Sequence, residues 1–134
     1  SAASSDYPLR DVYKRQDVAL PGYVADPYAW MAHADLFAFT SRWEGLGFVL
    51  IEALAVGTPV VSTDCPSGPS EILAQGRYGP LTPVGDDESL AQAILATLDD
   101  PLPPAILQEA ARPYEIETST DAYLETMGLE IERA

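Results

Sequence analysis

Short apolar runs mark the middle of the chain. Residues 36–40 form an unbroken apolar run that is too short for a helix, and residues 60–62 form a second. Such runs are typical of strands that are covered on both faces, as in parallel sheets. Residues 17–20 predict a further short strand, and residues 80–83 predict a last, weak one. Pro83 places this last strand at a sheet edge, because proline cannot donate a hydrogen bond to a neighbouring strand.

Helical patterns separate and follow these strands. Asp26 followed by Pro27 is a favourable helix start, with the aspartate as N-cap and the proline in the first turn. A later segment opens with three carboxylates at residues 86–88 and then carries an apolar face. That face consists of Leu90, Ile94, Leu95 and Leu98. In all, the sequence predicts helices at residues 27–34, 48–55, 70–73, 86–99, 105–111 and 120–127.

Strand and helix therefore alternate from residue 17 to residue 100. This order predicts an α/β fold in which a Rossmann-like parallel sheet is joined by helical crossovers. Residues 101–134 then form a helical C-terminal tail. Ligands of such sheets bind at the carboxyl ends of the strands, which are here followed by the loops at residues 22–25, 41–47 and 63–69.

Residues 1–16 do not share this organisation. They show no periodic pattern, and the string at residues 9–16 resembles translated adapter sequence from a sequencing library. We expect a leader that is either non-native or a poorly ordered native terminus, and we leave it out of the prediction of the fold.

Charge and cysteine content limit the partners and the location expected for the chain. The net charge of −14 would repel a phosphate backbone, so a nucleic-acid partner is not expected. Twelve acidic residues follow from Asp86 onward, and they form either a solvated surface or a face that docks on a basic partner. The single cysteine, Cys65, excludes an intrachain disulfide and fits a reducing, cytoplasmic location. No apolar run approaches the roughly 20 residues of a membrane span.

Residues 41–55 contain the main candidate for a ligand-binding site. Gly45 and Gly47 allow a ligand to approach the main chain closely, and they stand immediately before a helix whose first amides favour anions or sugar hydroxyls. Glu52 is the one polar residue of that apolar helix, and a diol would satisfy its carboxylate well. Glu44, in the loop, can accept hydrogen bonds from a second polyol.

Spacing alone leaves two interpretations of this stretch open, a ligand site and an ordinary loop-helix turn. Glycine loops before helices are common in α/β proteins, and Glu52 could simply emerge into water. The two carboxylates lie along one loop-helix element, whereas glycosidase carboxylates face each other across a bond, so hydrolytic acid–base work is not indicated.

Residues 44–61 resemble the E-x7-E signature of the GT-B retaining glycosyltransferases of family 4. In this chain the signature is formed by Glu44 and Glu52, and Leu46 replaces the commoner phenylalanine. The resemblance extends in consistent order over about residues 17–100, with further matching pieces at residues 20–24, 34–37, 64–73 and 78–86.

The resemblance implies a binding site for a nucleoside diphosphate sugar, with no cofactor and no metal. It implies that Glu44 and the amides of Gly45, Leu46 and Gly47 hold the donor sugar, with Glu44 as the catalytic residue. Glu52 would bind the ribose hydroxyls. Tyr23 and Val24 would lie near the base. The whole enzyme would transfer a hexose with retention of configuration.

The same resemblance implies that parts of the enzyme lie outside this chain. The family has two strands before residue 18, which bear basic residues for the diphosphate, and a preceding acceptor domain. The chain would then be the C-terminal half-domain of a GT-B fold and inactive by itself, and the intact enzyme could contact a membrane peripherally. Residues 18–20 would pair weakly or not at all. The alternatives are a non-catalytic nucleotide- or sugar-binding module and an architectural domain with an interaction role.

Overall fold

A three-stranded parallel sheet forms the centre of the computed structural model, which describes residues 18–129. Strands β1 (Phe37–Phe39), β2 (Val60–Thr63) and β3 (Leu81–Thr82) lie side by side in that order. Phe37 is paired with Val60. The predicted α/β class with a partial Rossmann-like sheet is confirmed, and β3 lies at the sheet edge as predicted.

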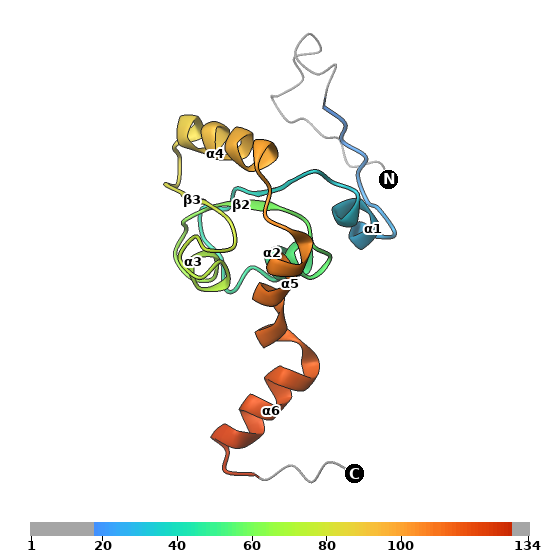
Figure 1. Ribbon diagram of the computed structural model, residues 1–134, viewed down its shortest axis with the longest axis vertical. Helices are drawn as coiled ribbons and strands as arrows, with labels where there is room; N and C mark the ends of the chain where they lie inside the picture. The colour runs from blue at the N-terminus through green and yellow to red at the C-terminus, as the bar shows by residue number, and fades with distance from the viewer. Residues whose placement is uncertain (1–17, 130–134) are drawn as a thin grey trace, which may run out of the picture.

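Helices connect the strands and cover both sides of the sheet. They are α1 (Pro27–Ala32), α2 (Phe48–Ala55), α3 (Pro69–Ile72), α4 (Asp87–Asp99), α5 (Pro104–Ala111) and α6 (Ile116–Thr126), with a short 3-10 helix η2 (Arg112–Tyr114) between the last two. Figure 1 shows α4 on one side of the sheet and α2, α3 and α5 on the other. Each predicted helix is present, although α6 begins earlier than the expected residue 120.

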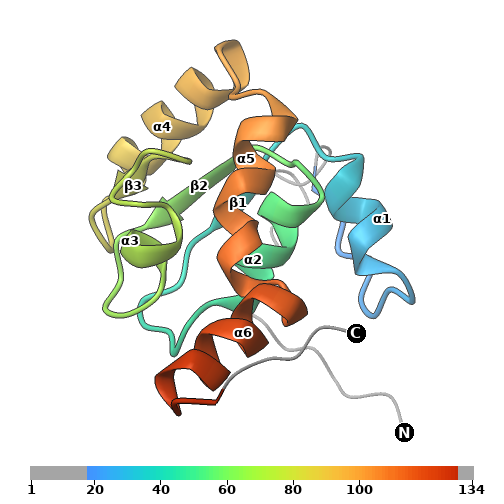
Figure 2. The same cartoon turned by 60° about the horizontal axis from the view of Figure 1, so that its bottom comes forward.

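The hydrophobic core lies between the sheet, α2 and α5. Leu50 and Leu54 of α2, Leu73 after α3 and Leu107 of α5 are almost completely buried. Helix α5 runs alongside α2 (Figure 2), and the two contact each other closely. A Cβ atom on Gly57, just after α2, would lie 2.8 Å from the Cβ of Pro104. This close approach lets α5 pack onto the helix that follows the candidate loop.

Strand β1 is covered on one face only, so the prediction of a strand buried on both faces is wrong. Phe39 is buried, but Ala38 is exposed. Two features explain the difference. Helix α4 packs mainly over β2 and β3, and β1 forms the other edge of the sheet within the described residues.

Residues 18–20 form no strand, which corrects the prediction of a strand at residues 17–20. Val18 is 57% exposed and Leu20 is 76% exposed. The sheet within residues 18–129 consists of β1, β2 and β3, and this segment pairs with none of them. The expectation that residues 18–20 pair weakly or not at all is confirmed, and Asp17 lies outside the described residues.

Helix α4 buries less apolar surface than its sequence suggests. Leu90 and Ile94 are half-buried, whereas Leu95 is 68% exposed and Leu98 is 45% exposed. Two of the four residues of the amphipathic face, Leu95 and Leu98, are therefore largely open to solvent.

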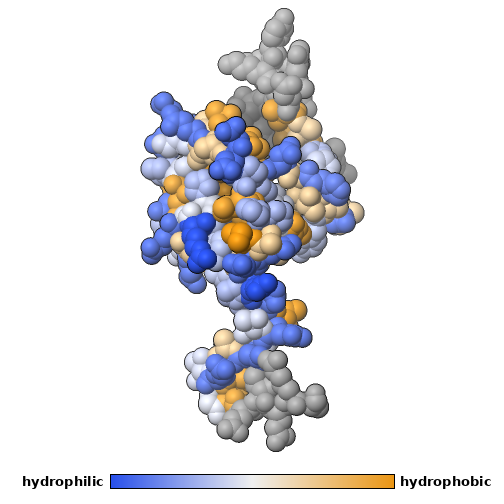
Figure 3. All heavy atoms as spheres, in the orientation of Figure 1, coloured by the Kyte–Doolittle hydropathy of each residue, from blue (hydrophilic) through white to orange (hydrophobic). Residues whose placement is uncertain are grey.

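Helix α6 projects away from the body as a narrow extension (Figures 1 and 3). None of its residues is buried, and its main contact is with η2. Apolar side chains such as Ile116 and Tyr123 are therefore open to solvent. Among the described helices, α6 included, none has the length and apolar character needed to cross a membrane.

Candidate functional site

The loop between β1 and α2 is held by hydrogen bonds from two hydroxyl side chains. The Ser41 hydroxyl donates to Glu44 Oε1 at 2.6 Å, which fixes the carboxylate of the half-buried Glu44. The Thr63 hydroxyl at the end of β2 donates to the carbonyl oxygen of Ser41 at 2.5 Å. The start of this loop is thereby tied to the carboxyl end of the neighbouring strand, where ligand sites of parallel sheets form.

Gly68 allows the next loop to contact this one, and Gly47 allows this loop to pack closely on β1. Gly68 has a φ of +89°, and a Cβ there would lie 2.0 Å from the carbonyl oxygen of Leu46. Gly47 has a φ of +86°, and its added Cβ would lie 3.4 Å from the Phe39 ring. Two of the three loops named from the sequence, at residues 41–47 and 63–69, therefore meet backbone to backbone, whereas residues 22–25 follow no strand in the described part of the chain.

Helix α2 begins directly after Gly47 and has no side-chain cap. Its first amides are therefore not bonded to a capping side chain, and such amides attract anions and hydroxyl oxygens. Leu50, Ile51, Ala53 and Leu54 bury one side of the helix in the core. This packing holds the helix N-terminus rigidly beside the loop that carries Glu44.

Glu52 lies in the second turn of α2 and is half-buried. The Tyr28 hydroxyl, from α1, donates to its Oε1 atom at 3.1 Å. The residue pattern predicts a diol or water as the partner of this carboxylate, and it does not mark Tyr28. The missed signal is the phenolic oxygen of a residue in the first turn of α1.

Tyr23 and Val24, in the segment before α1, differ in how far their side chains are buried. The Tyr23 side chain is 94% exposed and makes no hydrogen bond within residues 18–129, whereas Val24 is half-buried. Asp26 caps α1 by accepting from the Ala29 amide at 3.0 Å. No contact joins Tyr23 to Glu44 or Glu52 in the described structure, so its assignment to the base stays a prediction.

Cys65 lies buried in the loop after β2. Burial raises the pKa of its thiol, and the negative charge of Glu44 raises it further. The thiol is consequently kept neutral. A buried thiol that stays neutral is a poor nucleophile.

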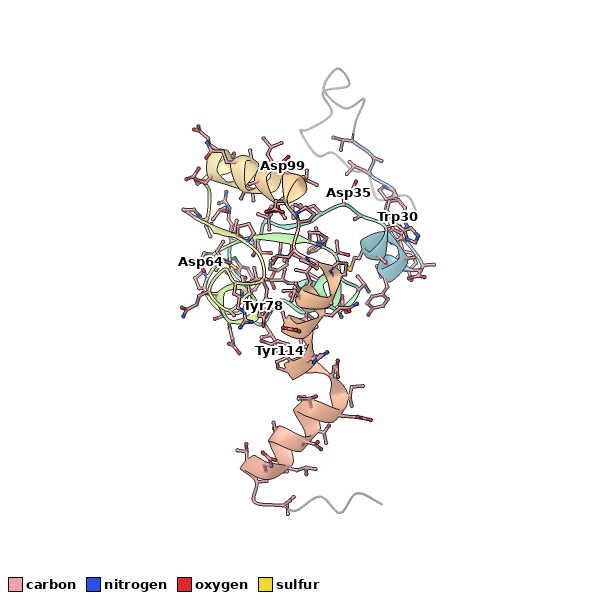
Figure 4. All side chains as sticks on the ribbon, viewed as in Figure 1. Trp30, Asp35, Asp64, Tyr78, Asp99 and Tyr114 are labelled. Carbon is pink, nitrogen blue, oxygen red and sulfur yellow. The ribbon has the colours of Figure 1, made fainter. Side chains whose placement is uncertain are left out.

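Aromatic side chains lie exposed next to the candidate residues. Trp43, before Glu44, is 80% exposed, and Phe48, after Gly47, is 70% exposed. Trp30 lies on the outer side of α1 (Figure 4) and is 58% exposed. No sequence pattern marked these three aromatic residues as part of the site.

A separate hollow lies at the other end of the strands, beside the amino ends of β2 and β3. Its lining includes Pro59, Arg77, Tyr78 and Asp100. The Arg77 guanidinium lies 5.0 Å from the centre of the Tyr78 ring, and Figure 4 shows Tyr78 within the body. This hollow is therefore distinct from the loops that carry Glu44 and Glu52.

Comparison with known proteins identifies the family. A match to the family described as "Glycosyl transferases group 1" covers residues 4–100. The chain belongs to this family. The match includes part of the leader at residues 1–16, whose origin stays a prediction.

Individual relatives of this glycosyltransferase chain support the assignment. It is 36% identical over 92 residues to an N-acetylgalactosamine-N,N'-diacetylbacillosaminyl-diphospho-undecaprenol 4-alpha-N-acetylgalactosaminyltransferase of Campylobacter jejuni, covering 69% of this chain and 25% of the relative. It is 34% identical over 115 residues to the lipopolysaccharide core biosynthesis glycosyltransferase LpsE of Rhizobium meliloti, covering 82% of this chain and 34% of the relative. The chain thus spans a quarter to a third of the length of these two relatives.

A solved structure supports the architecture. The crystal structure of TarM matches 79% of this chain and 22% of that chain, with a TM-score of 0.64 and 26% sequence identity. The expectation of a GT-B glycosyltransferase fold is confirmed. The roles of individual site residues stay predictions.

Proposed function

We propose that this glycosyltransferase chain binds the nucleoside diphosphate sugar donor of a retaining hexosyltransferase. The observation that carries the proposal is the joined loop-helix element of residues 41–55. In it, Ser41 fixes Glu44, the Leu46 carbonyl lies against Gly68 of the next loop, and Glu52 lies on the helix that follows.

Each part of the element has a role in this proposal. Glu44 and the amides of residues 45–47 hold the hydroxyls of the donor sugar. Glu52 accepts hydrogen bonds from the ribose diol, because one carboxylate can accept several at once. Tyr23 and Val24 lie on the side of the base. The first amides of α2 stabilise charge that develops on the leaving diphosphate.

The donor acts as a substrate, and the proposal includes no cofactor. The relatives are three to four times as long as the matched part of this chain. We assign to that additional length an acceptor domain, the basic residues that face the diphosphate and any peripheral membrane contact. The chain alone is therefore expected to bind donor without transferring sugar.

One observation favours a second candidate, an architectural role for Glu52. Its bond to Tyr28 gives the carboxylate a partner without any ligand. In this alternative Glu52 joins α1 to α2, and the domain serves as an interaction module.

Replacement of Glu52 by alanine distinguishes the two candidates. Donor binding predicts that the affinity for uridine, guanosine or adenosine diphosphate, whichever binds the unchanged chain most tightly, falls about tenfold or more, because hydrogen bonds to a charged group are lost. Isothermal titration calorimetry measures the affinity, and circular dichroism verifies the fold.

Glu109→Ala is the matched control, because Glu109 is an exposed carboxylate on α5. It should leave the affinity unchanged. A Glu52→Ala chain that unfolds, or that binds as tightly as the unchanged chain, would contradict the donor-binding role.

A further inference from the structure

Helices α1 and α2 are connected by a hydrogen bond at the candidate ribose end of the site. The Tyr28 hydroxyl donates to Glu52 Oε1 at 3.1 Å across 24 residues of sequence. Helix α1 contributes no buried residue, and its other polar tie to the body is the Thr58 hydroxyl, which donates to the Met31 carbonyl oxygen at 2.7 Å. Within the described residues this bond joins the two helices directly, while Met31 of α1 packs against the core.

Charge around Tyr28 keeps its hydroxyl protonated. The hydrogen bond to Glu52 and the charge of Glu52 raise the pKa of the phenol, and Asp26 at the start of α1 raises it further. His33, at the far end of α1, bonds the Ala29 carbonyl oxygen through Nδ1 at 2.7 Å. Tyr28 thus remains a hydrogen-bond donor throughout the neutral pH range.

The geometry leaves most of the carboxylate free for a ligand. An ionised carboxylate has about four acceptor positions, and Tyr28 occupies one of them, on Oε1. The remaining positions suffice for two adjacent hydroxyls. A hydrogen bond that holds one oxygen also restricts the rotamers of Glu52, which lowers the entropy cost of binding a diol.

We propose that Tyr28 is a positioning residue that orients Glu52 toward the ribose of the donor. This inference rests on the proposed function, because it requires Glu52 to bind a diol. Tyr28 is 50% exposed, and exposed pairs of this kind add little to stability. Helix α1 also follows shortly after Tyr23 and Val24. Tyr28 therefore connects the segment assigned to the base with Glu52, which is assigned to the ribose.

The test is Tyr28→Phe, which removes the hydroxyl and keeps the ring. Affinity is measured by calorimetry for the best-binding of uridine, guanosine and adenosine diphosphate and for its 2′-deoxy counterpart. The unchanged chain should prefer the ribonucleotide. Tyr28→Phe should weaken ribonucleotide binding about threefold to tenfold and reduce the preference over the deoxynucleotide. Tyr123→Phe, an exposed tyrosine of α6, should change neither affinity.

The outcomes separate this inference from the function on which it rests. If the unchanged chain prefers the ribonucleotide and Tyr28→Phe keeps both affinity and preference, the positioning role is wrong and donor binding stands. A lower melting temperature with an unchanged preference would show that Tyr28 is only a structural link. If the unchanged chain binds none of the diphosphates, both proposals fail.

Discussion

At the scale of single residues, Gly68 decides how closely two loops meet. Its φ of +89° is unfavourable for other residues, and the space beside it is filled by the Leu46 carbonyl group. The contact is backbone to backbone, so no side-chain movement can relieve an added methyl group. The position of Leu46 between Gly45 and Gly47 therefore depends on a glycine more than twenty residues away.

Gly68→Ala should destabilise the fold by at least about 2 kcal/mol, because backbone strain and a clash with the Leu46 oxygen add together. The free energy of unfolding in urea measures the effect. Gly45→Ala is the matched control, since a Cβ there meets nothing within 4 Å. Equal stability of the two variants would show that the loops are not in contact.

The residue pattern anticipated part of this residue-scale picture. It predicted that the Glu52 carboxylate either accepts hydrogen bonds or reaches water, because a lone carboxylate on an apolar helix is costly. It did not predict Tyr28, because the contact depends on how α1 packs on α2 and not on any local pattern.

At the scale of elements, the residues that begin helices were reliable guides to where helices start. Apolar patterns were poorer guides to which residues are buried. Asp26, Pro27 and the carboxylates at residues 86–88 mark helix starts that the structure confirms. The burial of β1 and of the α4 leucines was overestimated, because an apolar run does not reveal whether a covering layer is present.

The start of α4 provides a pH-dependent test of its cap. Asp86 accepts from the Ser89 amide at 2.9 Å and from the Ser89 hydroxyl at 2.6 Å. These bonds hold the pKa of the Asp86 carboxyl below its usual value. The cap therefore stabilises the folded state above the usual aspartate pKa, and this contribution is lost as the pH falls through the lower folded pKa.

Asp86→Ala should accordingly lower the melting temperature at pH 7, and the difference from the unchanged chain should shrink as the pH falls below about 4. Asp87→Ala serves as control, because Asp87 lies in the first turn without capping the helix. A difference that is the same at pH 7 and pH 3 would refute the capping role of the ionised carboxylate.

At the scale of the whole molecule, the parallel sheet explains why the loops after β1 and β2 lie together at the carboxyl ends of their strands. The rule that ligand loops follow the carboxyl ends of strands pointed to the loops at residues 41–47 and 63–69. The Thr63–Ser41 bond shows that these two loops meet. The projection of α6 was not predictable, because the sequence shows a helix but not what the helix packs against.

The most direct test of the donor-site assignment is a nuclear magnetic resonance titration of the 15N-labelled chain with uridine, guanosine and adenosine diphosphates. Donor binding predicts saturable shifts of the backbone amide signals of Gly45, Gly47 and Glu52 with one of these nucleotides. The signals of Arg77 and Tyr78, at the other end of the strands, should remain in place. Shifts confined to Arg77 and Tyr78, or no shifts with any of the three, would contradict the account.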